Sequence, residues 1–147
     1  MIIDKLMFYG DSVQDTRQLF FTSWQKYRNK QPLLPLEQQI VDVIIAHPEY
    51  HALLESNNKE QAYFPEMGQT NPFLHMGLHL AIREQVSTNR PEGITKIYQQ
   101  LLKKYAAPLA VEHSMMDYLA ECLWRAQREK TLPNEADYLQ ALKQLLN

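Results

Sequence analysis

The stretch Asn71-Pro72-Phe73-Leu74-His75-Met76-Gly77-Leu78-His79-Leu80 predicts a helix and a site on that helix. Asparagine is a favourable N-cap, and proline at the first helical position loses only an N–H that has no partner inside the helix. Once the chain is helical from Pro72, His75 and His79 lie on the same face, one turn apart. Two imidazoles at this spacing can bind one metal ion.

The other three histidines of the chain fall in two segments that repeat this spacing. These segments supply His47 and His51, and His113 with Asp117 and Glu121. Because His47 precedes a proline, we expect it to lie outside the helix, so His47 and His51 need not converge. We rank His75, His79, His113 and Asp117 as the first predicted ligands, and His47, His51 and Glu121 as the second.

Imidazoles and carboxylates without a thiolate favour iron, manganese, zinc or nickel over copper(I) or an iron–sulfur cluster. Helical proteins build such sites from side chains on facing helices. Two bridged ions would suit oxygen or peroxide chemistry, one ion with an open position would activate water, and a saturated ion would be structural. The sequence does not choose among these three, so it leaves open whether the protein is an enzyme.

A second hypothesis assigns the histidines a structural role, in which they cap helices and hydrogen-bond between them. The protein would then be a non-enzymatic module for protein–protein interaction, and the polar segment 57–70, predicted to be a loop, would be one place for a partner to bind. The sequence contains no glycine-rich phosphate-binding motif, so no nucleotide cofactor is expected.

The hydrophobic periodicity predicts helices and no strands. Their approximate ranges are 13–29, 36–46, 72–87, 91–105 and 108–130, with a last short helix through Tyr138 and Leu145. Prolines mark the short turns between them. We therefore expect an all-α single domain over residues 1–147, a bundle of five or six helices, with the order of residues 1–12 left open.

Composition and charge narrow the classes of protein to which this chain can belong. The net charge is −2, which gives no footprint for nucleic acid or for an anionic membrane. The longest apolar run, Val43–Ala46, is too short to span a bilayer, and Met1–Lys5 does not resemble the start of a secretory signal. Cys122 is the single cysteine, expected to be buried and inert. We expect a cytoplasmic protein whose partner would be a second copy of the chain or another protein.

Several segments resemble a bacterial family catalogued as domain of unknown function 1841. The resemblance rests on Asn71–Gln85, Arg90–Ile94, His47–His51, Glu112–Trp124 and the pair Leu132-Pro133 followed by Tyr138-Leu139. It extends from about Asp15 over nearly the whole chain, and the segment around His75 and His79 is its most specific part. It implies a small cytoplasmic bacterial protein and brings no activity, substrate or cofactor.

Overall fold

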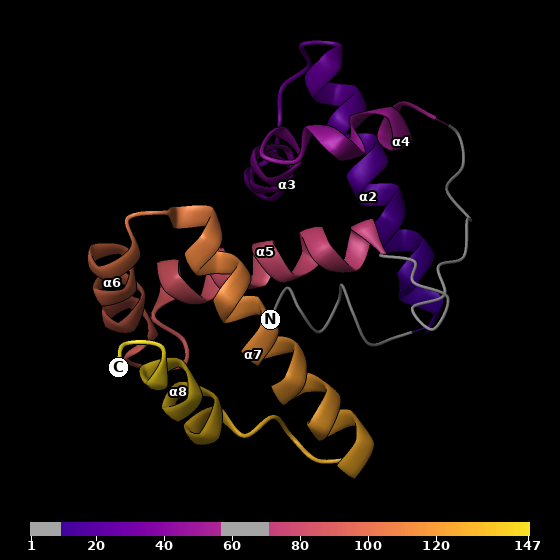
Figure 1. Cartoon of the computed structure of the whole chain (residues 1–147). Coiled ribbons are helices and arrows are strands. Elements are labelled where there is room, and N and C mark those ends of the chain that lie inside the picture. Colours follow the sequence, from indigo (N-terminus) through magenta and orange to yellow (C-terminus); the bar gives the residue numbers. More distant parts are fainter. Residues whose placement is uncertain (1–9, 57–70) are drawn as a thin grey trace. The chain divides into compact units, whose positions relative to one another are not determined.

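A computed structural model describes residues 10–56 and 71–147, with side chains from residue 17 onward (Figure 1). These residues form seven α-helices and one 3-10 helix, and there is no strand among them, so the predicted all-α class is confirmed. The elements are α2 (Gly10–Arg28), α3 (Pro35–Ile45), the 3-10 helix η1 (Pro48–Tyr50), α4 (His51–Glu55), α5 (Pro72–Thr88), α6 (Ile94–Tyr105), α7 (Pro108–Glu129) and α8 (Glu135–Gln144).

The helix count exceeds the predicted five or six because the short helix α4 follows η1 as an element of its own. The helix predicted from Pro91 begins at Ile94, since Gly93 has φ +103° and so cannot be its first helical residue. The helix predicted from residue 13 begins at Gly10. The predicted loop 57–70 and most of the segment 1–12 (residues 1–9) lie outside the described residues.

The chain divides into two compact units, Met1–Leu80 and Ala81–Asn147, and the division falls within α5. The predictions of a single domain over residues 1–147 and of a bundle therefore stay predictions. No helix in the described part of the chain is long and apolar enough to cross a membrane.

The core of the first unit is built from α2, α3, α4 and the first half of α5. Its buried side chains are Phe20, Phe21, Trp24, Ile40, Val41, Val43, Ile44, Leu54, Phe73, Met76 and Leu80. Phe20 and Phe73 meet edge to face with ring centroids 5.8 Å apart, an arrangement that aromatic pairs favour. This core holds the first half of α5 beside the segment that follows α3 and contains His47.

The second unit buries a stripe from each of its helices, and α7 packs against both α6 and α8. Its buried apolar side chains include Ile82, Ile94, Ile97, Leu101, Val111, Met115, Met116, Leu119, Leu123, Tyr138 and Leu142. The Asn134 side chain accepts a hydrogen bond from the Asp137 N–H at 3.1 Å and so caps α8.

Candidate metal centre

Helix α5 begins as its sequence predicts. The Asn71 Oδ1 accepts hydrogen bonds from the backbone N–H groups of Phe73 at 3.0 Å and Leu74 at 3.2 Å. The cap sets the helical phase, which places His75 and His79 on one face with their Nε2 atoms 3.3 Å apart. His79 is fully buried and His75 is half-buried. The predicted convergence of this pair is confirmed.

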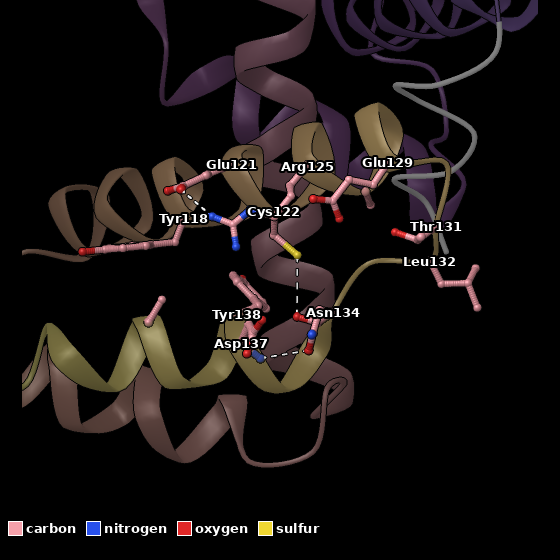
Figure 2. A pocket seen from close by; sticks show the side chains of 12 residues that line it. Tyr118, Glu121, Cys122, Arg125, Glu129, Thr131, Leu132, Asn134, Asp137 and Tyr138 are labelled. Atoms are coloured by element: carbon pink, nitrogen blue, oxygen red, sulfur yellow. Dashed lines mark hydrogen bonds and ion pairs between the residues drawn. The ribbon is translucent and has the colours of Figure 1, made fainter.

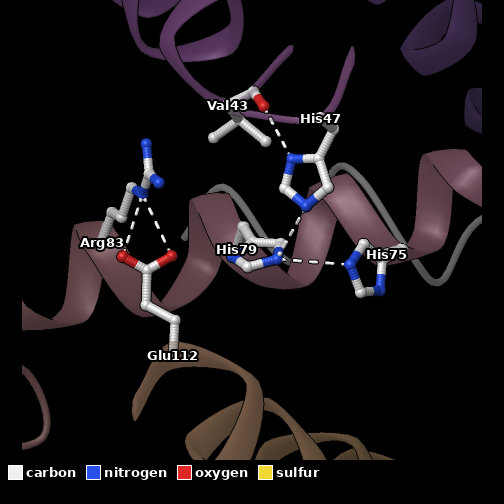
Figure 3. A network of polar contacts seen from close by, with 6 residues as sticks. All are labelled: Val43, His47, His75, His79, Arg83 and Glu112. Carbon is white, nitrogen blue, oxygen red and sulfur yellow. Dashed lines mark hydrogen bonds and ion pairs between the residues drawn. The ribbon is translucent and has the colours of Figure 1, made fainter. Parts of the chain in front are cut away.

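His47 reaches the same point from a different segment of the first unit. Its backbone (φ −128°, ψ 69°) is not helical, which confirms that the residue before Pro48 lies outside the helix. Its ring is buried, and its Nε2 lies 3.1 Å from the Nε2 of His79 (Figure 3). We call His47, His75 and His79 the histidine cluster.

The spacing of the histidine cluster suits one metal ion. Each ring offers a nitrogen, and these nitrogens lie within 4.8 Å of one another. Two ligands bound about 2.0–2.1 Å from one tetrahedral zinc ion are about 3.3–3.4 Å apart. The two Nε2 contacts of His79, at 3.1 and 3.3 Å, are close to that separation.

Hydrogen bonding among neutral rings accounts for only part of this geometry. The Nδ1 of His47 lies 2.8 Å from the carbonyl oxygen of Val43, which only accepts, so Nδ1 carries the hydrogen and Nε2 keeps a lone pair. The single Nε2 of His79 carries either one hydrogen or one lone pair, yet it faces two other Nε2 atoms. One well-aligned hydrogen bond can satisfy only one of these contacts, whereas a cation between the rings would attract all three lone pairs.

The bond from His47 to Val43 is also the outer-shell contact expected of a metal ligand. Metal-binding imidazoles commonly donate their second ring N–H to a carbonyl or carboxylate, which fixes the tautomer and aims the other nitrogen at the ion. The carbonyl of Val43 belongs to α3, so the end of that helix orients the ring of His47.

Tyr50 is a neighbour of the cluster that the sequence analysis missed. Its ring lies parallel to that of His47, with centroids 5.6 Å apart and planes 6° apart, and edge-on to that of His75 at 6.2 Å. Burial, and then the charge of Glu49, raise the pKa of its hydroxyl, which therefore stays protonated at neutral pH. The sequence signal for this contact was the spacing of three residues between His47 and Tyr50, because the 3-10 helix η1 brings residues at this spacing together.

His51 does not join the histidine cluster. Its Nε2 donates to the carbonyl of Ile44 at 2.8 Å, and its ring packs on Trp24 with centroids 4.6 Å apart. His47 and His51 therefore point to different partners, although their sequence spacing matches that of the pair on α5.

The three remaining predicted ligands, His113, Asp117 and Glu121, belong to the second unit. All three are exposed residues of α7. Glu121 forms an ion pair with Arg125 at 2.9 Å. Their roles as ligands stay predictions.

Cys122 lies in the second unit beside a cavity of about 230 Å³ between α7 and α8 (Figure 2). It is half-buried rather than buried as predicted, because it lines this cavity. Its Sγ donates a weak hydrogen bond to the carbonyl of Asn134 at 3.8 Å. Desolvation raises the pKa of the thiol, which argues against a nucleophilic thiolate.

Two pairs of buried or partly buried polar side chains lie within the second unit. The Nε of Arg83 donates to both carboxylate oxygens of the buried Glu112, each at 3.2 Å (Figure 3). The Tyr138 hydroxyl donates to Gln85 Oε1 at 2.7 Å, and both residues are buried. Each of these pairs joins a donor to an acceptor.

A family model described as Domain of unknown function (DUF1841) matches residues 12–144. Comparison with curated proteins gives no match, and neither does comparison with solved structures. The matched range contains every residue of the histidine cluster. That description names no chemistry, so the function has to be argued from the geometry.

Proposed function

This chain belongs to the family described as Domain of unknown function (DUF1841), and we propose that it binds one divalent transition-metal ion through His47, His75 and His79. The observation that supports the proposal is the convergence of three imidazole nitrogens within 4.8 Å of one another. Two of the three rings are buried, so an ion bound there would be shielded from solvent.

The donor atoms favour particular metals. Imidazole nitrogens suit zinc, iron and nickel, whereas manganese prefers carboxylate and carbonyl oxygens. The separations of 3.1 and 3.3 Å approach the spacing of ligands on a tetrahedral ion, so zinc is our first choice.

The role that we propose for the ion is structural. His47 lies between α3 and η1, while His75 and His79 lie on α5, so the ion would join two segments of the first unit that are far apart in sequence. Because such a site forms only in the folded chain, its binding free energy adds to the free energy of unfolding.

The test is metal analysis of untagged protein purified without chelator and then reconstituted with zinc. We expect about one equivalent of zinc in the wild type and in the matched control His51→Ala, whose ring is bonded elsewhere. The variants His75→Ala and His79→Ala should weaken zinc binding by more than about 100-fold, beyond the 10–100-fold effect of losing an outer-shell contact. Circular dichroism checks that each variant is folded.

Two results would overturn the proposal. The first is the absence of bound metal in the wild type after reconstitution with zinc, iron or nickel. The second is a loss of zinc in His51→Ala as large as that in His79→Ala. The variant His113→Ala in the same series tests the sequence-based prediction that His113 is a further ligand, because loss of a ligand should weaken zinc binding by more than about 100-fold, as in His79→Ala.

A further inference from the structure

Helix α7 carries a stripe of exposed side chains opposite its buried face. We define the α7 stripe as Glu121, Trp124, Arg125 and Arg128, whose spacing of three, four and seven residues places them on one side of the helix. The Trp124 residue is 57% exposed, and the three charged side chains are between 49% and 58% exposed. A tryptophan this exposed is unusual for a side chain of its size.

The composition of the α7 stripe is that of a binding surface. Tryptophan and arginine are enriched among the residues that contribute most to protein interfaces. The Arg128 guanidinium lies 4.5 Å from the centre of the Trp124 ring, and Glu121 pairs with Arg125 at 2.9 Å. Leu132, which follows α7, is 89% exposed.

We propose that the α7 stripe binds the same stripe of a second copy of this chain, with the two helices antiparallel. The argument is charge complementarity. When the two-fold axis passes between positions 124 and 125, Glu121 of each copy faces Arg128 of the other, and Trp124 faces Arg125. Each favourable contact then occurs twice, as an isologous interface requires.

The cavity between α7 and α8 supports this arrangement from the side of Arg125. This cavity has a volume of about 230 Å³. The charged side chains that line it are three acidic ones, Glu121, Glu129 and Asp137, and one basic one, Arg125 (Figure 2). The Trp124 of a second copy, placed opposite Arg125, would lie at the mouth of this cavity, and the Arg128 beside it would bring positive charge to an acidic rim.

The test is sedimentation velocity over a range of protein concentrations. A single helix face is at the small end of interface sizes, so we expect a concentration-dependent monomer–dimer equilibrium that high salt weakens. Trp124→Ala should abolish the dimer. The matched control is Leu109→Ala, on the same helix but outside the α7 stripe and 39% exposed, which should leave dimerisation unchanged.

Charge reversal tests the register. Glu121→Arg and Arg128→Glu should each weaken the dimer by at least about tenfold, because like charges then face each other twice. The double variant Glu121→Arg/Arg128→Glu restores opposite charges across the axis and should recover most of the affinity. Circular dichroism confirms that each variant keeps its helix content.

A wild type that stays monomeric at every concentration would overturn the proposal, as would a dimer that Trp124→Ala leaves intact. If both single variants are folded and dimerise more weakly than the wild type, the double variant should regain dimer affinity. A double variant that stays as weak as the single variants would overturn the antiparallel register.

Discussion

The two units treat their buried polar groups differently. The second unit joins opposite partners: Arg83 with Glu112, and the Tyr138 hydroxyl with the side-chain amide oxygen of Gln85. The first unit brings three like groups, the rings of the histidine cluster, to one point. Donor and acceptor satisfy each other within each pair, whereas we propose that the three converging rings bind a cation. On that proposal, zinc should add to the stability of the first unit, whereas the pairs of the second unit should contribute without an ion.

Zinc binding at the histidine cluster should change the stability of the protein more than any of the substitutions below. Free zinc at about 100 times its dissociation constant should add about 2.7 kcal/mol to the free energy of unfolding. For a chain of this size, that corresponds to an increase in Tm of roughly 5–10 °C in differential scanning calorimetry. His79→Ala should abolish the increase, and Arg83→Ala should retain it. A wild type whose Tm does not respond to bound zinc would contradict the structural role proposed for the ion.

The next effect comes from breaking a matched pair in the second unit. Arg83→Ala removes the ion pair of Glu112, whose side chain is only 7% exposed. We expect a loss of about 1–3 kcal/mol in urea unfolding, less than for a fully buried pair because the Arg83 side chain is 34% exposed. Arg83→Ala/Glu112→Gln should recover part of the loss, since the buried carboxylate that pairs with Arg83 is then replaced by a neutral amide.

The control for this measurement is Arg28→Ala. Arg28 pairs with Glu55, and both side chains are largely exposed, so its removal should cost less than about 1 kcal/mol. Equal losses for Arg28→Ala and Arg83→Ala would show that burial does not strengthen the pair in the second unit.

The smallest effect concerns a matched pair within the first unit. Lys26 and then the N–H of Leu34 hold the pKa of Glu37 below its usual value of 4.5. A carboxyl whose pKa is lower in the folded than in the unfolded chain adds stability above the unfolded value, and loses it as the pH falls through the folded value. In metal-free protein, the Tm should therefore fall below about pH 5, and Lys26→Met should reduce the dependence on pH. An unchanged dependence would show that this pair does not link stability to pH.

Much of the local structure could be predicted because it depends on residues within a turn or two of each other. The Asn71 cap, the start of α5 at Pro72 and the shared face of His75 and His79 all follow from helical geometry and backbone hydrogen bonding. The departure of His47 from the helix follows from the steric demand of Pro48 on the residue before it.

Spacing was a poor guide to the partners of the remaining histidines of the first unit. His47 and His51 have the same spacing as the pair on α5, yet His47 contacts His79, 32 residues away, and His51 contacts the carbonyl of Ile44. The break at Pro48 removes the helical phase that would relate the two rings, so packing decides where each ring points.

The helical class, the cap of α5 and one histidine pair can be predicted from the sequence, because they depend on interactions between near neighbours along the chain. The approach of His47 to His79 and the packing of Tyr50 against His47 depend on contacts that form only in the folded chain. Those contacts form because the apolar faces of α2, α3 and α5 share one core, which holds the end of α3 against the face of α5 that carries His75 and His79.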